Sequence, residues 1–267
     1  MRWRDRSVSR PPPEPDVPAQ MSAAYEAASR SDYAGALAIW GPLAQAGVAR
    51  AQSNVGACFA EGLGVARDLN LAARWLTLAA EAGDPVGQRN LAALYFKGEG
   101  IAQDFARAAV LYRAAAEQGD GPAQDMLSWM LLEGQCVECD VVEARHWAQA
   151  AADQGIAAAM TRLGMVYHNA LGIPRDSTEA ARWWRRGALA GDADGQAMLG
   201  AAHVLGSGVT PDPVAALTWL LRAQAGGSAL ATSFLAVARS ALDAAGIAKA
   251  EQRASTPLCD ADAEPGP

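Results

Sequence analysis

The sequence is poor in the residue types that most often carry catalysis or bind metals. Its 267 residues include only three histidines and four cysteines. The histidines, His146, His168 and His203, are not spaced like metal ligands or members of a catalytic triad. A Walker loop, a GxSxG elbow, an HExxH motif and a dinucleotide-binding glycine motif are also missing. The sequence therefore predicts a protein without a catalytic site, a metal or a cofactor.

Positive charge and long apolar runs are scarce as well. Lysine and arginine together number 22 against 29 aspartates and glutamates, so the formal net charge is −7. Nucleic-acid binding needs lysine and arginine clustered against phosphates, so we expect no nucleic-acid partner. No run approaches the roughly 20 apolar residues of a membrane-spanning helix, and no apolar segment follows the basic N-terminus to make it an export signal. We expect a cytoplasmic protein, or a periplasmic one if a signal sequence was removed.

The four cysteines are too few for a disulfide framework in a chain of this length. Only Cys136 and Cys139, in the segment GQCVECD, lie close together. Such a pair can be a redox couple, half of a zinc site or a local disulfide. Zinc would need two further ligands and a redox couple favours a thioredoxin-like context. The favoured interpretation is therefore a local disulfide or an ordinary loop.

Repetition is what the sequence has in abundance. Aspartate and glycine each recur at intervals of 36 residues. The aspartate column is Asp32, Asp68, Asp104, Asp140, Asp176 and Asp212, and the glycine column is Gly47, Gly83, Gly119, Gly155, Gly191 and Gly227. Each aspartate precedes a segment with helical spacing and is predicted to cap its first turn, while each glycine stands where such a helix ends most easily. We call the helix after the aspartate helix B and the helix before it helix A.

Other residues near the helix ends fit this interpretation. Asp140 with Glu143 and Asp176 with Glu179 have the spacing of a capping box. Polar residues that follow the column glycines are predicted to cap the next helix A, and these are Asp84, Asp120, Asp192 and Ser228.

Helix A combines an apolar stripe with a column of small residues. The small column is Gly56, Ala92, Ser128, Gly164 and Gly200, and we expect it to be covered by the helix B column Trp75, Leu111, Trp147, Trp183 and Trp219. A helix pair of this size does not bury its own apolar faces, so successive pairs must stack. The sequence predicts an all-α protein, a right-handed α-solenoid of antiparallel helix pairs.

These columns resemble the Sel1-like repeat, a relative of the tetratricopeptide repeat. The resemblance is carried by AQSNVGACFAEGLGVARDLNLAARWLTLAAEAG at 51–83 and GQRNLAALYFKGEGIAQDFARAAVLYRAAAEQG at 87–119. It implies five 36-residue repeats, at 48–83, 84–119, 120–155, 156–191 and 192–227. Segments 18–47 and 228–250 are predicted to be capping helices, and segments 1–17 and 251–267 to be disordered tails. The family implies a scaffold in signalling, regulatory or envelope-related assemblies, most often bacterial.

The candidate binding site lies on helix A outside the apolar stripe, because A helices line the concave side of such solenoids. The candidates are Asn54, Arg89, Asn90, Lys97, Met126, Trp129, Glu133, Arg162, Met165, Asn169 and Met198. The asparagines suit an extended peptide backbone, and the methionines and tryptophan suit adaptable apolar anchors. Alternatively, some of these side chains pack between neighbouring A helices. We predict a non-enzymatic adaptor that binds a protein or extended peptide, and the sequence does not indicate its oligomeric state.

Two further interpretations remain open. The segment RWWRR at 182–186 is expected to place Trp184 and its arginines on the outer side of helix B, as a solvated convex face or as a second docking patch. A cysteine-rich branch of the family is associated with binding or hydrolysing cell-wall-related ligands, which makes such an enzyme one alternative function. That branch has a cysteine pair in each repeat, whereas only Cys136 and Cys139 form a close pair here. A purely structural subunit of a larger complex is the other alternative.

Overall fold

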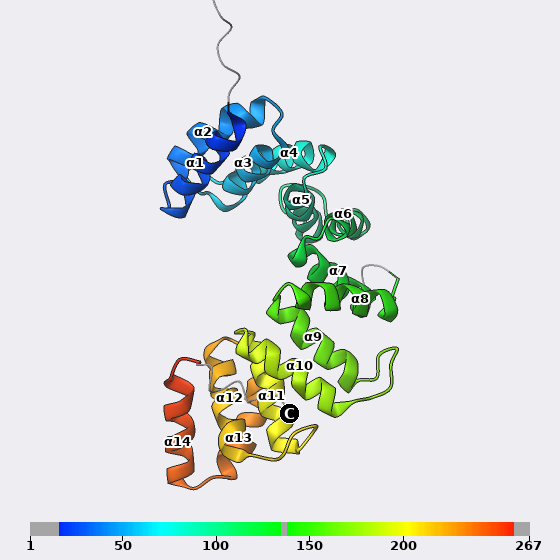
Figure 1. Cartoon of the computed structure of the whole chain (residues 1–267), viewed down its shortest axis with the longest axis vertical. Coiled ribbons are helices and arrows are strands. Elements are labelled where there is room, and N and C mark those ends of the chain that lie inside the picture. Colours follow the sequence, from blue (N-terminus) through cyan, green and yellow to red (C-terminus); the bar gives the residue numbers. More distant parts are fainter. Residues whose placement is uncertain (1–15, 135–137, 259–267) are drawn as a thin grey trace, which may run out of the picture. The chain divides into compact units, whose positions relative to one another are not determined.

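The computed structural model describes residues 16–134 and 138–258, and within these ranges the regular elements are all helical (Figure 1). The all-α class predicted from the sequence is confirmed. Antiparallel helix pairs follow one another along the chain, as expected for a solenoid. The chain divides into two compact units, one running to Asn90 and including Glu99–Ile101, the other comprising Leu91–Gly98 and continuing from Ala102.

The first unit contains α1 (Val17–Ser29), α2 (Tyr33–Gln45), α3 (Ala49–Glu61) and α4 (Leu69–Glu81). Helix α5 (Pro85–Lys97) begins in the first unit and ends in the second. The second unit continues with α6 (Phe105–Glu117), α7 (Gly121–Glu133), α8 (Val141–Asp153), α9 (Ala157–His168), α10 (Ser177–Leu189), α11 (Ala193–Leu205) and α12 (Pro213–Ala225). It ends with a short 3₁₀ helix (Ala229–Ala231), α13 (Thr232–Ser240) and α14 (Ala244–Ser255).

Each B helix begins at its column aspartate, as predicted. The carboxylate of Asp68 accepts a hydrogen bond from the backbone N–H of Leu71 at 2.9 Å. Asp104 and Asp176 make the same contact with the N–H three residues later, also at 2.9 Å. Because the first N–H groups of a helix have no partner within it, each cap fixes where its B helix starts.

The two predicted capping boxes are incomplete. Asp140 accepts from the backbone N–H of Glu143 at 2.9 Å, but its own N–H donates to the carbonyl of Leu131 at 3.2 Å. The Glu143 side chain points to an arginine of the preceding repeat, and the Glu179 side chain pairs with Arg182 at 3.2 Å. The second hydrogen bond of a capping box, from the aspartate's backbone N–H to the glutamate side chain, is therefore not formed, and its prediction was wrong. Each glutamate pairs with a nearby arginine instead.

The turns between repeats are short, as predicted. The column glycines all have positive φ, between 82° and 92° from Gly83 to Gly227, which lets each B helix stop within one residue. Asp192 then caps α11 by accepting from Gly195 N–H at 2.7 Å. Ser228 does not cap the next helix, since its hydroxyl donates to Asp194 at 2.6 Å instead.

A column of buried glutamines joins successive repeats, and the sequence analysis missed it. The amide of each glutamine, near the start of helix A, donates to a last-turn carbonyl of the preceding helix B. The pairs are Gln52 with Ala44, Gln88 with Ala80, Gln124 with Ala116 and Gln196 with Ala188, at 3.1, 3.5, 3.1 and 3.2 Å. These bonds satisfy carbonyls that a helix end would otherwise leave without a partner. Met160 interrupts the column in the fourth repeat.

The small residues of helix A receive the helix B residue one position later than predicted. A Cβ added to Gly56 or Gly200 would lie 2.7 Å from Cγ of Leu76 or Leu220, respectively. At Gly164 it would collide with the indole of Trp184, which is only 3% exposed. The prediction that Trp184 lies on the outer side of helix B was therefore wrong.

The predicted aromatic column still packs, but beside the small column rather than onto it. Trp183 is buried against the core of α8 and α9. Trp75, Trp147 and Trp219 are half-buried against clusters that include residues of the preceding helix pair. One residue along a helix turns the side chain by about 100°, so a one-position error exchanges the buried and flanking positions.

The C-terminal cap extends further than predicted. Ala231, Ala238 and Ala250 are buried in one apolar cluster with Leu217 and Leu220 of α12. Helix α14 runs to Ser255, so the prediction of disorder from residue 251 was wrong for 251–255. The predictions of disorder for 1–15 and 259–267 lie outside the described residues.

Candidate functional site

In the second unit, the A helices of successive repeats contact one another, α7 with α9 and α9 with α11. These helices carry most of the predicted site residues. Residues three and seven positions apart lie on one side of a helix, so the candidates at 126, 129 and 133 share a face of α7. Residues 162, 165 and 169 occupy the corresponding positions one repeat later. In α11, a further repeat along, residues 198 and 205 correspond to 162 and 169. We call this surface the A-helix face.

The large apolar candidates on the A-helix face are half-buried rather than exposed. Met126 and Trp129 pack against the core of α6 and α7. The Trp129 ring lies edge-on to Phe96, with 5.6 Å between the ring centroids. Met165 and Met198 pack against the cluster around Trp184. Part of each of these side chains is therefore packed against neighbouring helices, as the alternative interpretation of the sequence expected, and part remains accessible.

Arg162 forms an ion pair on this face instead of standing free. Its Nη2 lies 3.0 Å from Oδ1 of Asp125, and the two side chains are 17% and 14% exposed. Arg162 Nε is buried without a hydrogen-bond partner. The pair connects α9 to α7, so Arg162 contributes rigidity to the face and little net charge.

One exposed apolar residue on this face was missed by the sequence analysis. Leu205, the last residue of α11, is 66% exposed. It occupies the 36-residue column of Lys97, Glu133 and Asn169, which are also exposed. The column itself was visible in the sequence, so extending it by one repeat would have found Leu205.

Three candidates, Asn54, Arg89 and Asn90, belong to the first unit. Asn54 donates through Nδ2 to the hydroxyl of Tyr25 at 3.2 Å, and Tyr25 is itself an exposed aromatic. Arg89 and Asn90 are half-buried on α5. The repeated asparagines therefore differ in role, because the amide of Asn54 already has a partner in α1.

Two chemically suggestive residues, Cys139 and His168, lie in the second unit. Cys139 is an exposed thiol whose Sγ lies 3.8 Å from the carbonyl oxygen of Leu132. Cys136 lies outside the described residues, so the local disulfide stays a prediction. The His168 ring lies 5.2 Å from that of Trp184, and burial, with a smaller effect of Arg175, lowers the pKa of His168.

The part of the chain that the structure describes has neither a grouped set of metal ligands nor a membrane-spanning helix. Within 16–134 and 138–258, no three histidine, cysteine, aspartate or glutamate side chains are grouped so that they could hold a metal ion. In the same ranges, no helix has both the length and the apolar character needed to span a membrane.

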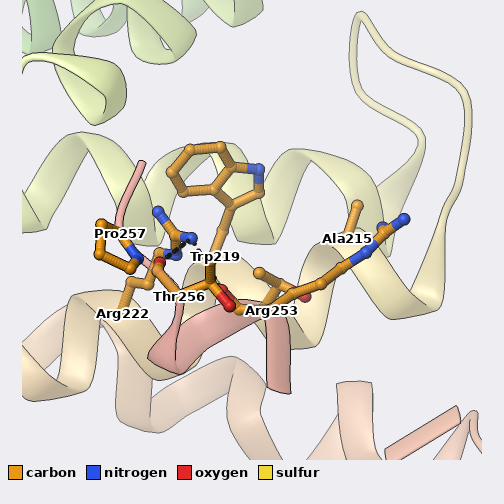
Figure 2. Close-up of a pocket in the computed structure, with 7 residues that line it drawn as sticks. Ala215, Trp219, Arg222, Arg253, Thr256 and Pro257 are labelled. Carbon is orange, nitrogen blue, oxygen red and sulfur yellow. Dashed lines mark hydrogen bonds between the residues drawn. The ribbon is translucent and has the colours of Figure 1, made fainter. Parts of the chain in front are cut away.

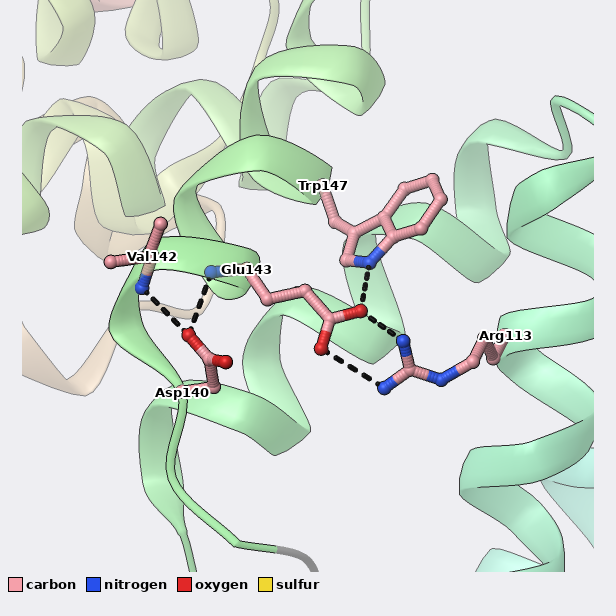
Figure 3. Close-up of polar contacts among 5 residues, drawn as sticks. All are labelled: Arg113, Asp140, Val142, Glu143 and Trp147. Carbon is pink, nitrogen blue, oxygen red and sulfur yellow. Dashed lines mark hydrogen bonds and ion pairs between the residues drawn. The ribbon is translucent and has the colours of Figure 1, made fainter.

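A polar network fastens one B helix to the next (Figure 3). The guanidinium of Arg113 on α6 donates to both carboxylate oxygens of Glu143 on α8, with 3.1 Å between Nη2 and Oε2. Trp147 Nε1 donates to Oε1 of the same carboxylate at 3.0 Å. The hydrogen bond from Arg113, then that from Trp147, lowers the pKa of Glu143 despite partial burial. The network stabilises the junction of the second and third repeats.

Capped helix pairs that stack through recurring glutamines and small residues define an α-solenoid repeat protein. The Sel1 repeat family model matches residues 49–84, 85–120, 121–156, 157–192 and 193–228. The chain belongs to the Sel1 repeat family. Sel1 repeat proteins are generally scaffolds for protein–protein interaction and are typically non-enzymatic.

Two solved structures resemble the chain. The chain is similar to a Sel1 repeat protein from Oxalobacter formigenes, with 31% identity, a TM-score of 0.76, and coverage of 88% of this chain and 95% of that one. It is similar in fold to a Sel1 repeat protein from Klebsiella pneumoniae, with 22% identity, a TM-score of 0.50, and coverage of 75% of this chain and 97% of that one. None of the curated proteins compared matches the chain.

Proposed function

We propose that this chain is a non-enzymatic adaptor that binds a protein or an extended peptide along the A-helix face of α7, α9 and α11. The observation that carries the proposal is the recurrence of partly exposed apolar side chains on one face of three successive repeats. These are Met126 and Trp129 on α7, Met165 on α9, and Met198 and Leu205 on α11. Large apolar side chains that stay partly accessible are typical binding anchors.

The surroundings of these anchors suit a peptide that runs across the helices. The exposed ends of the A helices carry Lys97, Glu133 and Asn169, which offer charge and an amide to a partner's main chain or side chains. The Asp125–Arg162 pair holds α7 and α9 together, so the face is organised before a partner arrives. A rigid surface loses less conformational entropy on binding, which favours affinity.

The cellular setting is part of the same proposal. The two solved relatives come from bacteria. We place the adaptor in a bacterial signalling, regulatory or envelope-related assembly, and in the cytoplasm.

Site-specific photo-crosslinking tests the proposal with little risk to the fold. A photoreactive amino acid is introduced singly at Glu133, Asn169 and Leu205, which are exposed and form no core contact. Val110 on α6 and Val142 on α8 are equally exposed positions on B helices and serve as matched controls. The variants are irradiated in host cells, and the crosslinked proteins are identified by mass spectrometry. The protein crosslinked most strongly is then purified on its own for direct binding measurements.

The expected result is one protein crosslinked from the A-helix positions and not from Val110 or Val142. Purified partner should then bind the wild-type chain, and Leu205→Glu should weaken binding by about tenfold, the loss of one apolar anchor. Crosslinks to the same partner from the B-helix positions alone would place the binding surface elsewhere and contradict the proposed site.

A further inference from the structure

A pocket in the second unit is lined by residues of α12 and of the end of α14 (Figure 2). Its volume is about 180 Å³, enough for several water-sized groups. The lining residues are Ala215, Thr218, Trp219, Arg222, Arg253, Thr256 and Pro257. Two of them are arginines and none is acidic, although the whole chain has a net charge of −7.

The guanidinium of Arg222 is only partly used by the protein. Its Nη2 donates to the carbonyls of Arg253 and Thr256, both at 2.8 Å, which cancels part of the negative end of the α14 dipole. Its Nε is buried without a partner. The guanidinium carbon lies 5.4 Å from the ring centroid of Trp219. Among the described residues no carboxylate pairs with Arg222, so no acidic side chain neutralises its positive charge.

The Arg253 side chain has less to hold it. Within the described part of the chain its side chain makes no hydrogen bond or ion pair, while its backbone carbonyl accepts from Arg222 and from the N–H of Thr256. In Figure 2 the guanidinium of Arg222 lies beside the indole of Trp219, whereas the Arg253 side chain extends away from them, toward Ala215. Two cations so arranged match a ligand that carries two negative groups separated by a short apolar spacer.

We propose that this pocket binds two carboxylates of an acidic peptide segment, one at each guanidinium, with the apolar residue between them against the Trp219 ring. Guanidinium–carboxylate pairs are short, charge-assisted hydrogen bonds, and the flat indole suits an apolar or aromatic side chain. A small dicarboxylic acid presents the same chemistry and is the other possible source. The site lies on α12 and α14, so it goes beyond the proposed function of the A-helix face and does not depend on it.

Titrations followed by the Trp219 indole N–H signal in NMR spectra test this proposal. The probes are the end-blocked peptide GDFEG, its neutral counterpart GNFQG, adipate, and the neutral diamide of adipate. The signal is assigned from the spectrum of Trp219→Phe. GDFEG is expected to bind about a hundredfold more tightly than GNFQG, since two charge contacts are lost and each is worth about tenfold, and to weaken as salt is raised.

Arg253→Gln is the decisive variant, because that side chain makes no bond that the fold needs. It should weaken GDFEG binding about tenfold without changing the thermal midpoint. Arg182→Gln removes an exposed arginine of α10 and serves as the charge-matched control, expected to bind like the wild type. Equal affinity for GDFEG and GNFQG, or unchanged binding in Arg253→Gln, would overturn the proposal. Adipate binding without GDFEG binding would overturn the peptide assignment and identify a small dicarboxylate as the occupant.

Discussion

Arg162 and Asp125 form an ion pair 3.0 Å long that ties α9 to α7, and both side chains are largely buried. Removing one partner leaves the other charge poorly solvated, so Arg162→Met should lower the free energy of unfolding by roughly 1–3 kcal/mol. The double variant Asp125→Asn with Arg162→Met should recover part of that loss. Urea unfolding of the wild type, Asp125→Asn, Arg162→Met and the double variant measures these free energies. A double variant no more stable than Arg162→Met would contradict the expectation.

Replacing Ala170 by glycine is expected to stabilise the protein. It has φ of 57°, in the left-handed region, and occupies the position held by Gly62, Gly98, Gly134 and Gly206 in the other repeats. An L-residue there is strained by about 1 kcal/mol, so Ala170→Gly should raise the urea midpoint. The reverse change, Gly62→Ala, should lower it by a similar amount, because an added Cβ comes no closer than 3.4 Å to its neighbours and only the φ strain changes.

Two glycines with similar φ should respond very differently to alanine. A Cβ at Gly208 would collide with the backbone of Ser177, the first residue of α10, whereas a Cβ at Gly191 meets nothing within 4 Å. Gly191→Ala should therefore cost only the strain of positive φ, about 1 kcal/mol, while Gly208→Ala should cost more than twice that. Thermal unfolding of both variants provides the comparison. Equal losses would mean that the loop at Gly208 yields without disturbing α10.

The Arg113–Glu143 pair should make stability depend on pH. Its hydrogen bonds lower the folded-state pKa of Glu143 below its ordinary value of 4.5, so the stabilisation is complete above pH 4.5 and disappears as pH falls through the folded-state pKa. Arg113→Met should therefore be less stable than the wild type near pH 7, by up to about 1 kcal/mol because Arg113 is partly exposed. The difference should shrink below pH 4.5, whereas Arg182→Met should show no comparable trend. A difference that persisted at low pH would indicate lost packing rather than lost charge pairing.

Much of the fold could be predicted because its determinants are local and recur. An aspartate cap acts on an N–H three residues away, and a glycine at positive φ acts on its own backbone, so Asp68 and Gly83 can be interpreted without knowing the tertiary structure. The position of Trp184 could not be predicted in this way. Its burial depends on how helix B is rotated against Gly164, and tertiary packing sets that rotation.

The candidate site was predicted less completely for a similar reason. The columns indicate which residues share positions along the A helices, but whether Arg162 stands free depends on Asp125, which lies a repeat away at a different column position. The pocket at Arg222 was beyond sequence reasoning, since three of its seven lining residues, Arg253, Thr256 and Pro257, lie in a segment predicted to be tail. Contacts between distant segments, rather than properties of single helices, account for both misses.

Helices α13 and α14 also cover the side of α12 on which a further repeat would stack. They bury the apolar side of α12, with Ala250 in the same cluster as Leu217 and Leu220, and Arg222 fastens the last turn of α14 in place. Stacked repeats are inherently open-ended, and a bare terminal helix would accept the first repeat of another copy. With this side of α12 covered by α13 and α14, another copy's repeat cannot stack on it, so head-to-tail addition through that face of α12 is blocked.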